Sequence, residues 1–160
     1  MVGAVFQAAS DFGVRRAVGI EMAASRHALA ASKLAGLRDA DVASRCLPVQ
    51  GDCSDAALWS AAPGADAPLA EASVIYIASL LFSSELMTRL AQRIVEMAGN
   101  GQSSLRVVAT LKRFRRGALR RARLRERLPP AFIDMSWSPS MGPGQPVYIY
   151  VRRHPAAEPR

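Results

Sequence analysis

The chain has 160 residues, half of them hydrophobic, and carries a formal net charge of +8. This length suits one domain with a sizeable core, and the apolar fraction excludes an intrinsically disordered chain. The sequence has no apolar run long enough to cross a bilayer, no basic leader of the signal-peptide type, and too few cysteines for a disulfide scaffold. We therefore expect a nuclear or cytoplasmic protein with no membrane partner. We also expect no metal site, because no zinc pattern matches the spacing of His27, Cys46, Cys53 and His154.

The first third of the chain alternates helix-like and strand-like segments. In chain order, the hydrophobic spacing predicts a helix over 4–12, a strand over 17–21, a helix over 25–37 and a strand over 46–50. The strand over 17–21 ends in Glu21. An acidic residue at the end of the second strand of a nucleotide-binding βαβ unit holds the ribose hydroxyls. Because the first strand and glycine-rich loop of such a unit precede its first helix, we expect both to be missing ahead of residue 1.

The rest of the chain continues this alternation and closes with two strands. Residues 60–71 are rich in Ala, Pro, Gly and Asp and predict a loop. The strand expected over 74–78 is apolar on both faces, which is typical of the middle of a sheet covered on both sides. Ser83 or Ser84 is expected to cap a long helix that ends at 99–101. The remaining expected elements are a strand over 105–111, antiparallel strands over 132–137 and 147–151, and a disordered tail over 153–160.

The excess positive charge sits in one segment, residues 112–127. This segment holds nine basic residues and one acid, whereas the remaining chain carries twelve of each. We expect it to be partly helical before Pro129-Pro130, with arginines that wrap around the helix as in a flexible nucleic-acid arm. The alternative is a solvated face that aids solubility. The residues expected to contact nucleic acid are Arg115, Arg116, Arg120, Arg121 and Arg123.

The order of elements predicts an α/β fold with an open, mostly parallel sheet, helices on both faces and a C-terminal antiparallel strand pair. Five short motifs occur along it: Val5-Phe6-Gln7-Ala8-Ala9, Gly19-Ile20-Glu21-Met22, Gly51-Asp52-Cys53, Phe82-Ser83-Ser84-Glu85-Leu86, and the pair Met135-Ser136-Trp137 with Val147-Tyr148-Ile149-Tyr150. In this order and spacing they resemble the Dot1-like histone-lysine methyltransferases, a group with the Rossmann-like class I fold that uses S-adenosyl-L-methionine (SAM). The resemblance covers residues 2 to about 152, and we expect one domain over residues 1–152 with the basic segment inside it.

The resemblance implies SAM as the cofactor. It implies that Glu21 holds the ribose hydroxyls and that Asp52 accepts from the adenine amine, with Cys53 beside the ring. Ala78-Ser79 stands where the family has an asparagine near the methyl donor. The full set of implied cofactor-binding residues is Gly3, Glu21, Met22, Asp52, Cys53, Ala78 and Ser79. No residue is identified as a catalytic base.

The leading functional hypothesis is therefore SAM-dependent methyl transfer to a histone lysine, with a histone, nucleosome or nucleic acid as partner. One alternative is a non-catalytic relative that binds nucleic acid or another acidic partner through residues 112–127. A second alternative is methylation of a small molecule or another protein, because the fold does not determine the acceptor.

Overall fold

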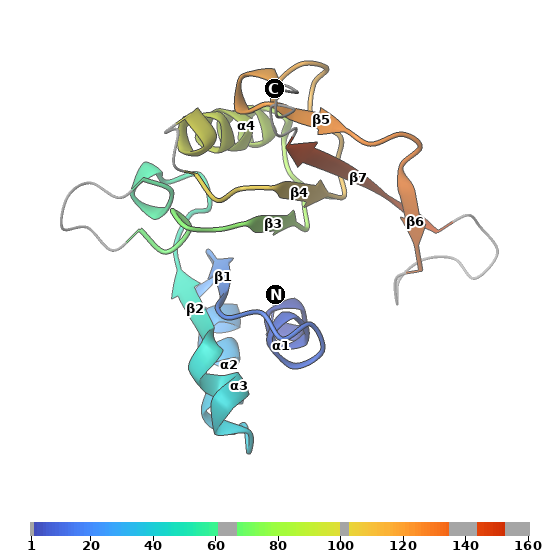
Figure 1. The fold of residues 1–160 in the computed structure, drawn as a ribbon. Helices are drawn as coiled ribbons and strands as arrows, with labels where there is room; N and C mark the ends of the chain where they lie inside the picture. The colour runs from blue at the N-terminus through green and yellow to red at the C-terminus, as the bar shows by residue number, and fades with distance from the viewer. Residues whose placement is uncertain (1, 61–66, 100–102, 135–143, 153–160) are drawn as a thin grey trace, which may run out of the picture. The chain divides into compact units, whose positions relative to one another are not determined.

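The computed structural model describes residues 2–60, 67–99, 103–134 and 144–152 (Figure 1). The chain divides into two compact units, Met1–Leu58 and Trp59–Arg160. Each unit contains strands and helices, so the protein is an α/β protein with mixed parallel and antiparallel pairing. No helix in the described ranges is long and apolar enough to cross a membrane.

The first unit is built on two parallel strands. Its elements are α1 (Val2–Ser10), β1 (Ala17–Glu21), α2 (Ala24–Ala35), α3 (Ala40–Arg45), β2 (Cys46–Gln50) and the short 3-10 helix η1 (Ala56–Leu58). β1 and β2 pair from Ala17 opposite Cys46 to Glu21 opposite Gln50. The α2–α3 connection between them supplies the crossover that parallel strands need.

A small apolar core holds this unit together. Ala9, Ala17, Val42 and Cys46 are buried, and partly buried side chains of α1, including Val5 and Phe6, pack against them. α1 ends before Gly13, whose φ of +58° is the left-handed conformation that glycine adopts without strain. The sequence predicted both strands with these bounds. It missed α3, which has six residues and is capped by Asp39, whose Oδ1 accepts from the N–H groups of Asp41 and Val42.

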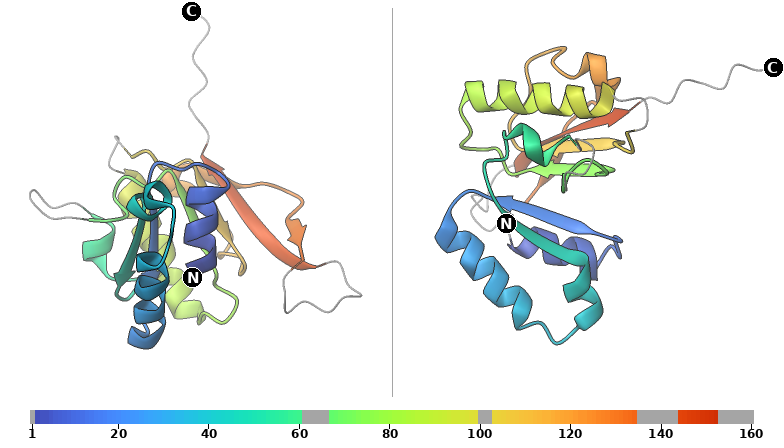
Figure 2. Two further views of the ribbon diagram at one scale, coloured as in Figure 1. Left: turned by 90° about the horizontal axis from the view of Figure 1, so that it is seen from below. Right: turned by 90° about the vertical axis from the view of Figure 1, so that its left-hand side faces the viewer.

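In the second unit, the helix α4 lies on one face of a mixed sheet (Figure 2). Its elements are β3 (Val74–Ile77), α4 (Ser84–Gly99), β4 (Val107–Thr110), the 3-10 helix η2 (Arg120–Ala122), β5 (Leu124–Glu126), β6 (Ala131–Ile133) and β7 (Gln145–Arg152). The strand order is β3-β4-β7-β5, and β6 also pairs with β7. β3 and β4 are parallel, whereas β7 is antiparallel to β4, β5 and β6.

The helix α4 buries one apolar face on the sheet. Leu90, Ile94 and Met97 are 1%, 0% and 4% exposed, at the spacing of successive helical turns. The hydroxyl of Ser83 accepts from the N–H of Leu86 at 3.1 Å, so Ser83 is the residue that caps this helix.

Three expectations from the sequence are corrected here. The sheets are not mostly parallel, because three of the five strand pairings among the described residues are antiparallel. β3 is not covered on both faces in its unit: Ile75 and Ile77 are buried, but Val74 and Tyr76 are 62% and 47% exposed. The basic segment, expected to be a partly helical flexible arm, contains helix only as the three-residue 3-10 helix η2 and continues into the strand β5, with positive φ at Gly117 and Arg123.

The antiparallel pair expected near the C-terminus is confirmed as β6 and β7. The expectations for Met135, Ser136, Trp137, the tail over 153–160 and part of the loop over 60–71 lie outside the described residues.

Candidate functional site

The carboxyl ends of β1 and β2 carry the two acids that the sequence singles out. Because Glu21 pairs with Gln50, Asp52 follows two residues beyond that pair. The N–H of Gly51 donates to the carbonyl oxygen of Glu21 at 3.1 Å, which ties the turn before Asp52 to the end of β1. Glu21 and Asp52 therefore leave the two strands at the same end, the end at which ligands bind in open α/β sheets.

Glu21 is held as an ionised acceptor. Its side chain is 12% exposed, and its Oε1 accepts from the N–H of Ala23 at 2.9 Å and from Nη2 of Arg26 at 3.1 Å. The backbone hydrogen bond from Ala23 lowers the pKa of Glu21, with Arg26 adding to the effect, and this outweighs the opposing effect of burial. Among the described residues, both groups that donate hydrogen bonds to the Glu21 carboxylate donate to Oε1. Oε2 is thus able to accept from a ligand hydroxyl.

The side chain of Asp52 stabilises the turn in which this residue lies. Its Oδ1 accepts from the N–H of Ser54 at 2.8 Å and from the Ser54 hydroxyl at 2.9 Å, which is the geometry of an Asx turn. Asp52 is exposed and Cys53 is half-buried, while Met22 next to Glu21 is 70% exposed. The Asp52 carboxylate therefore stabilises the turn that leads from the end of β2 to Ser54.

Gly3 lies in the first turn of α1 and is exposed. A Cβ added to it would meet nothing within 4 Å, so the space around Gly3 does not itself require a glycine. Ala78 and Ser79 belong to the second unit, where they follow β3, and Ala78 is exposed.

Ser79 closes a ring of hydrogen bonds between the ends of β3 and β4. It is fully buried, as is Thr110, and their hydroxyl oxygens lie 2.5 Å apart. The N–H of Lys112 donates to Ser79 Oγ at 2.9 Å, and Thr110 Oγ1 donates to the carbonyl oxygen of Lys112 at 3.1 Å. Because the Thr110 hydroxyl donates its proton to the carbonyl oxygen of Lys112, the Ser79 hydroxyl is the donor in the hydrogen bond between the two hydroxyls. The Ser79 hydroxyl therefore holds two strand ends together, and the sequence did not anticipate its partners Thr110 and Lys112.

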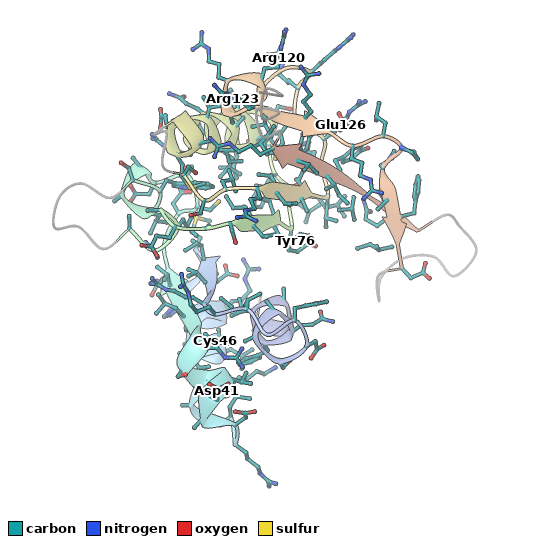
Figure 3. All side chains as sticks on the ribbon, viewed as in Figure 1. Asp41, Cys46, Tyr76, Arg120, Arg123 and Glu126 are labelled. Atoms are coloured by element: carbon teal, nitrogen blue, oxygen red, sulfur yellow. The ribbon has the colours of Figure 1, made fainter. Side chains whose placement is uncertain are left out.

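Most of the predicted nucleic-acid contacts gather around one open hollow of about 1110 Å³ in the second unit. Five exposed arginines line it, and we call this site the arginine hollow: Arg115, Arg116, Arg120, Arg123 and Arg125. Figure 3 shows side chains projecting outward around Arg120 and Arg123. Arg121 is exposed but is not among the lining residues.

Arg125 also lines the hollow, although it is not among the contacts expected from the sequence. In the strand β5, Leu124 is buried and its neighbours Arg123 and Arg125 are exposed. The alternation Arg-Leu-Arg-Glu over 123–126 was the signal that could have revealed this.

The one acid of the segment is already paired. Nε of Arg113 lies 2.9 Å from Oε1 of Glu126 and 3.0 Å from Oε2, and it donates to Oε2. The guanidinium of Arg113 also lies 5.9 Å from the centre of the Tyr148 ring. The Glu126 carboxylate raises the pKa of Arg113, and the two side chains form a local ion pair.

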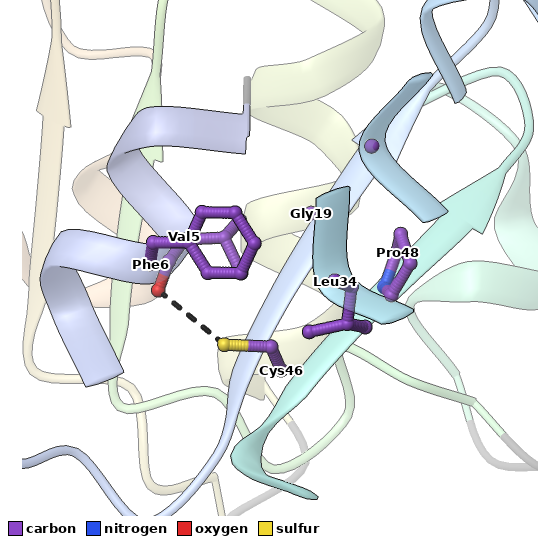
Figure 4. Close-up of a pocket in the computed structure, with 7 residues that line it drawn as sticks. Val5, Phe6, Gly19, Leu34, Cys46 and Pro48 are labelled. Atoms are coloured by element: carbon purple, nitrogen blue, oxygen red, sulfur yellow. Dashed lines mark hydrogen bonds between the residues drawn. The ribbon is translucent and has the colours of Figure 1, made fainter. Parts of the chain in front are cut away.

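A further cavity in the first unit is too small to hold a ligand (Figure 4). Its volume is about 10 Å³, the size of one water molecule, and its lining is apolar, with Val5, Phe6, Leu34, Cys46 and Pro48 among its residues. Sγ of Cys46 donates to the carbonyl oxygen of Val5 at 3.8 Å. Burial raises the pKa of the Cys46 thiol, so this cysteine is a packing residue.

Within the described ranges, no group of three or more His, Cys, Asp or Glu side chains is arranged to hold a metal ion. No protein-family model matches the chain, and no curated protein or solved structure matches it either.

Proposed function

We propose that this chain is a class I SAM-dependent methyltransferase domain that binds the adenosyl group through Glu21 and Asp52. The observation that carries the proposal is the position of these two acids at the same end of adjacent parallel strands. In open α/β sheets this is the ligand end, and a carboxylate there accepts from ribose hydroxyls. The depressed pKa of Glu21 keeps it an acceptor at neutral pH.

The sheet of the second unit adds support from topology. β7 is inserted between β4 and β5 and runs antiparallel to both. This order resembles the C-terminal half of the class I methyltransferase sheet, in which the last strand is inserted antiparallel beside the edge. The antiparallel placement of β7 between β4 and β5 therefore supports a Rossmann-like class I fold. It is also one reason why antiparallel pairings outnumber parallel ones among the described strands.

The chain's own residues divide the binding task. Glu21 Oε2 would accept from the ribose, while Oε1 stays fixed by Ala23 and Arg26. Asp52 would accept from the adenine amine. SAM, when bound, supplies an electrophilic methyl group on a sulfonium. The acceptor we propose is a lysine amine of a histone, on the Dot1-like resemblance alone.

Calorimetric titration of the full chain with S-adenosylhomocysteine tests the proposal. We expect micromolar binding and at least a roughly tenfold loss in Glu21→Gln, because a hydrogen bond to a charged group contributes about 1.5–3 kcal/mol. Glu71→Gln, at an exposed acid in the second unit, is the matched control and should bind like the wild type. A folded chain that gives no binding heat, or equal losses in both variants, would overturn the proposal.

A further inference from the structure

The arginine hollow lies outside the adenosyl site proposed above and belongs to the other unit. The backbone that carries the lining arginines is anchored by buried side chains and by a hydrogen bond to β7. Leu119, Ala122 and Leu124, between and beside the lining arginines, are 3%, 1% and 3% exposed. The N–H of Arg127 donates to the carbonyl oxygen of Ile149 at 2.7 Å, which attaches the end of the segment to β7. The arginines therefore project from an ordered surface, and the flexible arm expected from the sequence is replaced by a pre-organised one.

In the part of the chain that the structure describes, no ion pair balances the charge of the arginine hollow. Glu126 also lines it, but this carboxylate is already paired with Arg113 from outside the lining set. No ion pair joins any of the five lining arginines to an acid among the described residues. Five like charges around one hollow repel one another and concentrate anions from solution.

The residue type indicates the kind of anion. The guanidinium group presents a planar fork of donors that matches phosphate oxygens in a bidentate manner. A single phosphate would occupy one or two such forks, whereas five exposed forks fit a polymer that presents several phosphates at once.

The aromatic residues of the hollow distinguish between nucleic acids. Proteins that bind single strands stack unpaired bases on exposed aromatic rings. The two aromatic residues that line this hollow, Phe114 and Tyr150, are only 4% and 5% exposed, so they offer no stacking surface. We propose that the arginine hollow binds the phosphate backbone of duplex nucleic acid without reading its sequence.

Fluorescence anisotropy with a labelled 20-base-pair DNA duplex of arbitrary sequence tests this inference on the full chain. The test variant is Arg115→Glu/Arg116→Glu. The control is Arg15→Glu/Arg16→Glu, which makes the same charge change at an adjacent exposed pair in the first unit. We expect the test variant to bind at least about tenfold more weakly and the control to change less than about twofold. The slope of log K against log salt should become shallower by about 2 in the test variant alone. Equal losses in both variants, or no binding at low salt, would overturn the proposal.

Two further measurements test the ligand class and the effect of charge reversal. Unlabelled duplex RNA and duplex DNA should both compete, since the two share the phosphate chemistry. An oligothymidine strand that competes as well as the duplex would overturn the assignment to duplexes, and so would inorganic pyrophosphate that competes at equal phosphate concentration. Arg115→Gln/Arg116→Gln, which removes charge without adding acid, should also lose affinity while its circular dichroism matches the wild type. Wild-type affinity in this variant would equally contradict the proposal.

Discussion

The hydroxyl oxygen of Tyr150 accepts a hydrogen bond from the backbone N–H of Phe114 at 3.0 Å. The two rings also meet edge to face, with centroids 5.6 Å apart and planes at 66°. Both residues are buried. This pair joins the start of the basic segment to β7, so one side chain fixes both the strand and the loop that carries the first arginines of the hollow.

Tyr150→Phe should lower the free energy of unfolding by about 1–2 kcal/mol, because it leaves the buried N–H of Phe114 without an acceptor. Tyr148→Phe is the matched control. Tyr148 is half-buried, and no hydrogen bond to its hydroxyl is present within the described residues. Urea unfolding monitored by circular dichroism compares the two. Equal losses would show that the Phe114–Tyr150 hydrogen bond contributes nothing particular.

Alkaline pH should destabilise the protein through the same residue. Burial raises the pKa of Tyr150 to about 12, whereas the unfolded chain releases this proton near its ordinary value of 10. The native state therefore binds the Tyr150 proton more tightly than the unfolded state does. The stability that this difference contributes is present below pH 10 and is lost as pH rises from 10 to 12. Between pH 9 and pH 11 this group should lower the free energy of unfolding by about 1 kcal/mol. Tyr150→Phe should show a correspondingly smaller decrease, measured by urea unfolding at both pH values. A decrease of the same size in the variant would contradict this assignment.

The strands of the first unit were predictable because their signals are local. β1 and β2 are short apolar runs, and Gly51-Asp52 marks the end of the second. The acids that follow were predictable for the same reason, since each stands directly at or after a strand end. The six-residue α3 was not, because a single turn and a half carries too little periodicity to identify a helix.

The second unit depends on contacts between distant parts of the chain. Phe114 and Tyr150 are 36 residues apart, and Ser79 and Thr110 are 31 apart. Local spacing contains no information about either pair. The exposure of Val74 and Tyr76 likewise depends on whether another layer covers their face of β3, and the sequence pattern of β3 alone suggested burial on both faces.

The Ser79–Thr110 pair should behave as a coupled unit. Ser79→Ala leaves the N–H of Lys112 without its acceptor, and Thr110→Val leaves the carbonyl oxygen of Lys112 without its donor. Each single change should cost about 1–3 kcal/mol of unfolding free energy. The double variant should cost less than the sum by about 1 kcal/mol, because the hydrogen bond between the hydroxyls can be lost only once.

A control cycle pairs Ser79→Ala with Thr88→Val. The Thr88 hydroxyl donates to the carbonyl oxygen of Ser84 on the exposed side of α4 and does not contact Ser79 within the described structure. These two changes should add to within about 0.5 kcal/mol. Additivity in the Ser79–Thr110 cycle as well would rule out the closed ring of hydrogen bonds.

The two cysteines should differ in reactivity. Burial raises the pKa of the Cys46 thiol, and only the thiolate attacks a disulfide reagent. Cys53 is half-buried in the turn after Asp52. With Ellman's reagent at pH 8, we expect one thiol to react at least about tenfold faster than the other in the native protein, and both to react quickly in urea. Cys53→Ser should remove the fast phase, whereas Cys46→Ala should retain it. If Cys46→Ala instead removed the fast phase, the packing of Cys46 against Val5 would have to open readily in solution, and the core of the first unit would be looser than the burial of Ala9, Ala17 and Val42 indicates.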